Sequence, residues 1–248
     1  MRVLLLGGTT EASHIALALA EAGVEGTFSY AGRTTMPVTQ PIPTRVGGFG
    51  GIDGLVRYLK RERITHVIDA THPFAAQISR NAVEACSRTA APLIAYKRAN
   101  WFPLADDNWH HVSDIDAAVA ALPNAPARIF LAIGKQSLSS FAAQPHHFYL
   151  LRLVDAPAAP LPFPKTEVVL ARGPFTTEGD LALLSSRRIT HVVAKNAGGT
   201  GATAKLEAAR MLGLKVIMIN RPRMPERETA TSVEEIMNWV RHSARLGV

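Results

Sequence analysis

Cysteine and long apolar runs are the two features that this sequence most clearly lacks. Its 248 residues contain one cysteine, Cys86, which excludes an internal disulfide and a cysteine zinc cluster and suits a reducing compartment. No apolar run approaches the roughly 20 residues of a membrane-spanning helix. The first run, residues 3–6, stops at Gly7 and is too short for a secretion signal. We therefore expect a cytoplasmic protein with no membrane partner.

Acidic and aromatic residues are also scarce. Lys and Arg number 27 against 20 Asp and Glu, which gives a formal net charge of +7 spread along the chain. This balance favours a polyanionic partner, which could be nucleic acid, a phosphate-bearing cofactor or a multiply carboxylated small molecule. Aromatic residues make up 6% of the chain and do not alternate with basic ones on a predicted strand, so we expect no nucleic-acid partner.

Apolar runs that end in glycine turns and continue into amphipathic helices predict a parallel α/β sheet. The first strand covers residues 3–6, and the helix after it buries Ala12, Ile15, Ala16 and Leu19. Further strands are predicted at 26–32, 65–70 and 92–96, and helices at 52–62 and 74–89.

The second half of the chain repeats this plan. FLAIGKQS at 130–137 resembles VLLLGGTTE at 3–11, and RITHVV at 188–193 repeats RITHVI at 63–68. We predict two Rossmann-like, doubly wound α/β domains with parallel sheets, at residues 1–98 and 99–222. Residues 223–248 form a C-terminal segment and helix that starts with a capping box, Ser232 and Glu235. The half on which this helix packs is left open.

The first strand-to-helix turn is a candidate phosphate site. Gly7 and Gly8 allow a ligand to approach the backbone, Thr9 and Thr10 offer hydroxyls, and the helix N-terminus favours an anion. The turn matches neither G-x-G-x-x-G nor a Walker loop. A plain tight turn is the alternative interpretation.

The end of the second strand offers Ser29 and Arg33 where NAD-binding sheets place an acidic residue. A guanidinium there can pair with a 2′-phosphate, so a cofactor would be NADP rather than NAD. Arg33 as a solvated surface charge is the alternative. The loop at 45–51, with Gly47 and Gly48, gives either backbone access to a ligand or flexibility.

Polar residues also end the later predicted strands. DATHPF at 69–74 includes His72, which is more often structural than chemical as a lone histidine. The second half carries four basic residues at strand or turn ends, and together they predict a site for carboxylates: Lys135, Arg172, Lys195 and Lys205. Solvated basic loops are the alternative. The histidine pairs at 110–111 and 146–147 do not form a metal site, because neighbours on a strand face opposite ways, and we expect no metal.

Longer motifs run in order along residues 3–222. They are GGTTE, SYAGR, VGGFGGIDGLVRYL, VIDATHPFA, KRANW, GKQ, RGPF, KNAGG-x-G with K-x-x-AAR-x-LG, and a closing RP. Together they resemble the precorrin-6A reductase family of the cobalamin pathway. VIDATHPFA and KNAGG-x-G are the specific parts of this resemblance.

The resemblance implies an NADPH-dependent oxidoreductase that reduces one double-bond system of the precorrin-6A macrocycle to give precorrin-6B. It implies a carboxylate-rich tetrapyrrole as substrate and a cofactor held mainly by the first domain. The oligomeric state is left open, with a monomer as one option. The expected cofactor-binding residues are Gly7, Gly8, Thr9, Thr10, Glu11, Ser29, Arg33, Gly47, Gly48, Thr71, His72, Pro73 and Phe74. The expected substrate-binding residues are Arg98, Lys135, Arg172, Lys195, Asn196, Gly198, Gly199 and Lys205. The proton donor is left open among Lys135, His72, Lys195 and a bound water.

Three other functions are carried as alternatives. The substrate could be the cobalt-containing analogue of the same macrocycle. A tetrapyrrole-modifying enzyme without a dinucleotide would have no use for Arg33 or the GGTTE turn. A non-enzymatic dinucleotide sensor would leave KNAGGTG unexplained.

Overall fold

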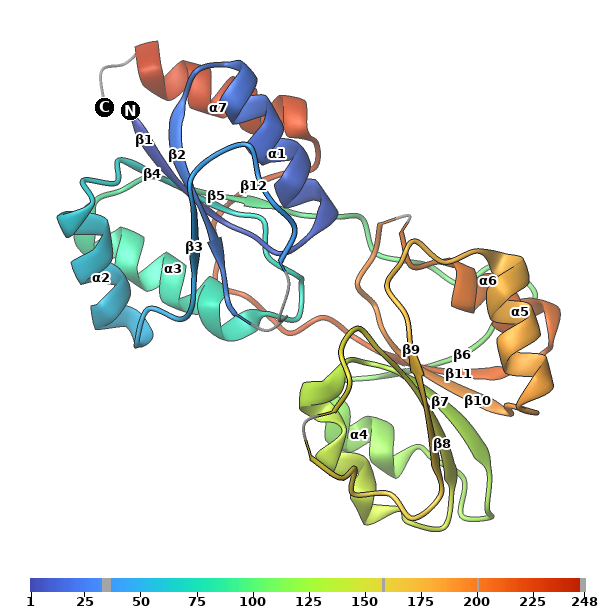
Figure 1. The fold of residues 1–248 in the computed structure, drawn as a ribbon. Helices are drawn as coiled ribbons and strands as arrows, with labels where there is room; N and C mark the ends of the chain where they lie inside the picture. Colours follow the sequence, from blue (N-terminus) through green and yellow to red (C-terminus); the bar gives the residue numbers. More distant parts are fainter. Residues whose placement is uncertain (33–36, 158, 200, 246–248) are drawn as a thin grey trace. The chain divides into compact units, whose positions relative to one another are not determined.

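The computed structural model describes residues 1–32, 37–157, 159–199 and 201–245, which form two compact units (Figure 1). Unit 1 consists of Met1–Arg98 with Arg223–Val248, and unit 2 of Ala99–Pro222. Each unit contains a six-stranded sheet in which every described strand pair is parallel. The predicted α/β class with two Rossmann-like parallel sheets is confirmed.

Unit 1 has the strand order β12-β5-β4-β1-β2-β3. Its strands are β1 (Arg2–Leu6), β2 (Glu25–Tyr30), β3 (Thr44–Val46), β4 (His66–Asp69), β5 (Leu93–Tyr96) and β12 (Glu228–Ala230). Its helices are α1 (Thr10–Glu21), α2 (Gly51–Arg61), α3 (Ala76–Thr89) and α7 (Val233–Arg245). The C-terminal helix α7 packs beside α1 (Figure 1).

Alternation along β1 explains why helices cover both faces of this sheet. Val3 and Leu5 join the core beneath α1 and α7, whereas Leu4 and Leu6 join the core beneath α2 and α3. Side chains of a strand point alternately to opposite faces, so a continuous apolar run is buried on both sides. Cys86 lies in the second of these cores, and burial raises the pKa of its thiol to about 12, as suits a structural residue.

Unit 2 has the strand order β6-β11-β10-β7-β8-β9. Its strands are β6 (Asn108–Val112), β7 (Arg128–Ala132), β8 (Phe148–Leu153), β9 (Thr166–Leu170), β10 (His191–Lys195) and β11 (Lys215–Ile219). Its helices are α4 (Ile115–Ala120), α5 (Thr177–Ser186) and α6 (Ala204–Met211), with two short 3₁₀ helices at Lys135–Ser137 and Ser139–Ala143. Phe130, Leu150 and Val192 form the centre of the core against α5 and α6.

The two sheets share one strand order when β1–β5 are matched with β7–β11. The repeated sequence segments then fall on equivalent strands, β1 with β7 and β4 with β10. The sixth strands of the two sheets exchange their places in the chain. β6 follows β5 of unit 1 in the chain but pairs with β11 of unit 2, whereas β12 follows β11 of unit 2 but pairs with β5 of unit 1. The chain therefore passes between the units twice.

The structure differs from the sequence-based elements mainly at sheet edges. β3, β6 and β12 were not predicted, because short edge strands carry little periodic signal. The interior strand β8 was not predicted either. The predicted helix at 74–89 begins at Ala76, and the predicted strand at 26–32 ends at Tyr30. The Ser232 hydroxyl accepts the Glu235 N–H at 3.1 Å as expected, although the Glu235 carboxylate bonds to the Thr231 N–H rather than to Ser232.

The structure also bears on the expectation of no membrane segment. Within the ranges described above, no helix has the length and apolarity needed to cross a bilayer.

A buried ion pair fastens the exchanged segment to the sheet of unit 1. The Oδ2 atom of Asp69, at the end of β4, lies 3.1 Å from the Nη1 atom of Arg227, just before β12. The side chains are 1% and 16% exposed. Breaking a buried pair leaves an uncompensated charge, which costs much more than breaking an exposed one.

We expect Asp69→Asn to lower the free energy of unfolding by about 3 to 5 kcal/mol, because it leaves Arg227 without its counter-charge. Urea denaturation measures the change. Asp53→Asn is the matched control, since Asp53 pairs with Arg88 at 3.0 Å on the surface and should cost less than about 0.5 kcal/mol. Equal effects of the two substitutions would contradict an anchoring role for the buried pair.

His147 makes the stability of unit 2 depend on pH. The residue is fully buried directly before β8, and its Nδ1 atom accepts the Ala127 N–H at 3.1 Å. Burial, with smaller contributions from His146 and His191, lowers the pKa of His147 to about 4. The folded state therefore binds fewer protons than the unfolded state between about pH 4 and the unperturbed pKa near 6.5, so stability is lost as pH falls through that range.

Lowering the pH from 7.5 to 5 should cost the wild type about 1 to 2 kcal/mol more than His147→Asn, which keeps a side-chain acceptor without the titration. Urea denaturation at the two pH values measures the difference. The exposed His110→Asn variant should behave like the wild type. An unchanged pH dependence in His147→Asn would show that another group is responsible.

Candidate functional site

The turn between β1 and α1 combines one packed glycine with one open one. The Gly7 N–H donates to the Ser29 carbonyl at 3.0 Å, and a Cβ on Gly7 would lie 2.2 Å from the Phe28 ring. Gly8 has a φ of +113°, and no atom lies within 4 Å of where its Cβ would be. The backbone is therefore accessible at Gly8, next to the N-terminus of α1, where N–H groups favour an anion.

The two threonines of this turn differ. The Thr9 hydroxyl accepts the Ala12 N–H at 3.1 Å and donates to the Ala70 carbonyl at 2.8 Å, so it caps α1 and ties the turn to the end of β4. Thr10 is exposed. A ligand would therefore meet the backbone of Thr9 rather than its hydroxyl.

Arg33 and residues 34–36 lie outside the described residues.

The neighbouring ends of β2 and β3 carry Arg45, a candidate site residue that was not predicted from the sequence. The Arg45 guanidinium donates to the Ser29 Oγ at 2.7 Å and to the carbonyls of Gly47 and Gly48 at 2.9 and 3.0 Å. Gly47 and Gly48 thus act here through their carbonyls. An arginine directly before a glycine-rich loop was the available signal.

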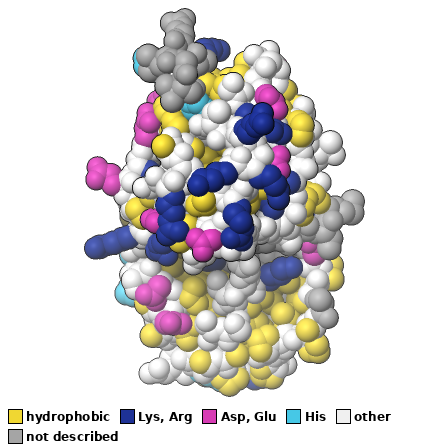
Figure 2. Space-filling view, turned by 90° about the vertical axis from the view of Figure 1, so that its left-hand side faces the viewer, with side chains coloured by type: hydrophobic (Ala, Val, Ile, Leu, Met, Phe, Trp, Pro, Cys, Tyr) yellow, Lys and Arg dark blue, Asp and Glu magenta, His cyan; other side chains and the backbone are white. Residues whose placement is uncertain are grey.

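Arg45 also lines a basic hollow of about 580 Å³ beside α2, together with Arg57, Lys60, Arg61 and aromatic residues of the same segment. Its guanidinium carbon lies 3.9 Å from the centre of the Phe49 ring. Burial lowers the pKa of Arg45; Tyr58 opposes this effect and Arg61 adds to it. Figure 2 shows Lys and Arg side chains gathered on the face of unit 1 that carries α2.

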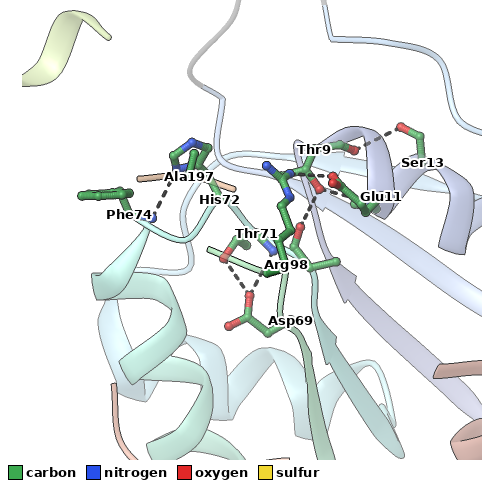
Figure 3. A network of polar contacts seen from close by, with 12 residues as sticks. Thr9, Glu11, Ser13, Asp69, Thr71, His72, Phe74, Arg98 and Ala197 are labelled. Carbon is green, nitrogen blue, oxygen red and sulfur yellow. Dashed lines mark hydrogen bonds and ion pairs between the residues drawn. The ribbon is translucent and has the colours of Figure 1, made fainter. Parts of the chain in front are cut away.

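Glu11 and Arg98 form an ion pair, with 2.6 Å between Oε2 and Nη2 (Figure 3). Their side chains are 21% and 15% exposed. The pair links the start of α1 to the chain after β5. A cofactor contact for Glu11 and a substrate contact for Arg98 stay predictions.

Asp69 organises the turn after β4 (Figure 3). Its Oδ1 accepts the N–H and the hydroxyl of Thr71 at 3.1 and 2.7 Å. His72 is exposed, and its Nδ1 accepts the Phe74 N–H at 3.2 Å. Unit 1 thus brings the turns that contain Gly8 and Thr71 to the carboxyl ends of the adjacent strands β1 and β4, which is where parallel α/β sheets bind ligands.

In unit 2, the KNAGG turn is held against the segment that contains Ala99 and Trp101. Asn196 exchanges two hydrogen bonds with the backbone of Trp101, at 2.9 and 3.0 Å. A Cβ on Gly198 would lie 2.0 Å from the Ala99 carbonyl, and Gly199 accepts the Trp101 indole N–H at 2.7 Å. These three predicted substrate residues therefore have clear structural roles.

The basic residues predicted for unit 2 differ in exposure. Lys135 and Arg172 are exposed, while Lys195 is half-buried and donates to the Ser137 Oγ at 3.3 Å. Lys205 is buried, 5.0 Å from the centre of the Trp101 ring, and burial lowers its pKa to about 8. The structure adds Arg152, which forms a buried ion pair with Asp180 and lies 4.0 Å from the centre of the Phe175 ring. Nothing in the local sequence pattern pointed to it.

No group of three or more potential metal-ligating side chains occurs among the residues for which coordinates are described.

Comparison with known proteins gives consistent matches over nearly the whole chain. The family model described as precorrin-6x reductase CbiJ/CobK matches residues 2–241. A precorrin-6A reductase of Rhodobacter capsulatus is 63% identical over 96% of this chain and 95% of its own length, and one of a Sinorhizobium species is 46% identical over 97% and 93%. A solved structure described as CobK precorrin-6A reductase superposes with a TM-score of 0.94 at 62% identity, covering 98% of this chain and 96% of that one. The predicted resemblance is confirmed: the chain belongs to the precorrin-6x reductase family.

Proposed function

We propose that the chain reduces precorrin-6A to precorrin-6B in cobalamin biosynthesis, using NADPH. The observation that carries the proposal is 63% identity, over nearly the full length of both chains, to a protein named precorrin-6A reductase. The relative at 46% identity has the same name. Both names favour the metal-free macrocycle over its cobalt-containing analogue.

The open turn at Gly8 supports a dinucleotide in unit 1. The N–H groups of Gly8, Thr9 and Thr10 at the start of α1 suit the diphosphate, and the packed Gly7 holds the turn against the sheet. The nicotinamide end would lie at the turn formed by Thr71, His72, Pro73 and Phe74, because β4 is adjacent to β1.

The choice of NADPH over NADH rests on the end of β2. Ser29 stands there in place of an acidic residue, which would hold the ribose hydroxyls of NAD. Arg33, three residues beyond Tyr30, would supply the cation for the 2′-phosphate.

The substrate would be held through its carboxylates by basic groups of unit 2. Lys135 and Arg172 are exposed to solvent at strand ends of unit 2, and Lys195 donates a hydrogen bond to Ser137. The cofactor would supply the hydride, so the chain must supply orientation, charge and one proton. Lys135, His72 and Lys195 are the candidate proton donors.

Gly8→Val should abolish detectable NADPH binding, because its side chain would fill the space through which the diphosphate reaches the backbone. The variant should fold, since no atom lies near the new Cβ, although the φ of +113° costs about 1 to 3 kcal/mol of stability. Isothermal titration with NADPH, alongside circular dichroism, measures both effects. Gly23→Val is the control for backbone strain, since Gly23 has a φ of +66°, lies just beyond the C-terminal end of α1 and likewise has no atom near its Cβ position. Normal NADPH binding by Gly8→Val would refute the phosphate assignment.

Arg33→Ala should weaken NADPH binding roughly 10-fold or more while changing NADH binding little, because only NADPH carries the 2′-phosphate. The dissociation constants of both nucleotides, followed by turnover of precorrin-6A, measure this. Equal losses for the two nucleotides would remove Arg33 from the phosphate site. Nucleotide binding without turnover would contradict the reductase function.

A further inference from the structure

The Arg45 guanidinium lies beside the end of β2. Arg45 is opposite Ser29 in the parallel register of β2 and β3, and Ser29 is opposite Leu6, the last residue of β1. The Ser29 side chain accepts a hydrogen bond from Arg45, while the Ser29 carbonyl accepts one from Gly7. A single residue therefore connects the guanidinium to the turn proposed to hold the diphosphate.

The hydrogen bonds of Arg45 leave one edge of its guanidinium available. A guanidinium has five N–H donors. Toward described residues, Nη1 donates to the Ser29 Oγ and the Gly47 carbonyl, and Nη2 donates once, to the Gly48 carbonyl. The Nε–H and one Nη2–H have no partner among the described residues, and a guanidinium can present Nε and Nη2 together along one edge of its plane. Two parallel donors of this kind match two oxygens of a phosphate.

The charge of Arg45 is also uncompensated within the described part of the chain. None of the ion pairs between described residues includes Arg45, Arg57 or Lys60, whereas Arg61 pairs with Glu62 at 2.8 Å. Burial of a cation without a counter-ion is unfavourable, and an anion bound there would relieve that cost. The stacked Phe49 ring fixes the plane of the guanidinium in advance.

In dinucleotide-binding sheets, the adenosine ribose lies at the carboxyl end of the second strand. We infer that Arg45 is a specificity-determining residue, whose Nε and Nη2 edge binds the 2′-phosphate of NADPH. The inference rests on the proposed function, because it requires a dinucleotide at the turn after β1. It places a determinant of cofactor choice on β3, outside the residues proposed above.

A purely structural role is the competing explanation, because Arg45 holds the carbonyls of Gly47 and Gly48 and thereby shapes the loop before α2. Loss of that role would affect phosphorylated and unphosphorylated nucleotides alike. Loss of a phosphate contact would affect only the nucleotides that carry a 2′-phosphate. The two explanations therefore predict different ratios of affinity.

The test is isothermal titration of the full chain with NADP⁺, NAD⁺, 2′,5′-ADP and 5′-AMP. Arg45→Ala should weaken NADP⁺ and 2′,5′-ADP roughly 10- to 100-fold and leave NAD⁺ within about threefold. Arg45→Lys should lose part of the same preference, because it keeps the charge without the two-donor edge. Arg57→Ala, which lines the same hollow, is the matched control and should change all four affinities by less than about threefold.

Each outcome decides the inference. A selective loss in Arg45→Ala, with Arg57→Ala unchanged, supports it. Equal losses for NADP⁺ and NAD⁺ overturn it and leave the proposed function standing, as does an Arg57→Ala effect as large as that of Arg45→Ala. Failure of the wild type to bind any of the nucleotides overturns both the inference and the proposed function. If Arg45→Ala does not fold, Arg45→Lys decides: an unchanged preference for NADP⁺ refutes the inference.

Discussion

The contact between Phe28 and Gly7 fixes the geometry of unit 1 where the chemistry is proposed. The Phe28 ring occupies the volume that any side chain at position 7 would need. Position 7 must therefore be glycine for β1 to end in a close turn against β2. That close turn delivers the start of α1 to the edge of the sheet, and the Thr9 hydroxyl then bonds to the end of β4. Three adjacent strand ends are thereby held together by one small residue, one ring and one hydroxyl.

Local periodicity predicted most interior strands of the two sheets, with the exception of β8, and it did not predict the edge strands β3, β6 and β12. The strands β1 and β11 consist mostly of continuous apolar runs, and such runs can be recognised in a sequence because they are buried on both faces. β6 contains Trp109 among mostly exposed polar residues, and β12 is three residues long. Both become strands only because β11 and β5 offer unpaired edges, and this depends on tertiary structure.

The candidate site shows the same division. Turn residues such as Gly8 and Thr71 could be named from their positions after predicted strands. The partner of Asp69 could not, because Arg227 lies in a segment that joins unit 1 only through the exchange of β12. The part played by Arg45 depends on the register of β2 and β3, and β3 has too few residues to be recognised in the sequence.

The basic residues fall into two groups, those paired with a carboxylate and those without such a partner among the described residues. Arg98, Arg152 and Arg227 are each neutralised by a partly or fully buried carboxylate, so they stabilise the fold rather than set the external field. The cations around the hollow beside α2 are largely without such partners among the described residues. A count of charges over the sequence cannot make this distinction, because it depends on which carboxylates the fold brings near.

The exchange of β6 and β12 has a consequence for how the protein is made. A ribosome releases the chain from its N-terminus, yet the sheet of unit 1 receives its last strand and the helix α7 from residues after 223. Until those residues emerge, the face of α1 that packs on Ile236, Met237 and Val240 has no cover, and β5 is an open edge. The fold of unit 1 therefore remains incomplete until the whole of unit 2 has been synthesised.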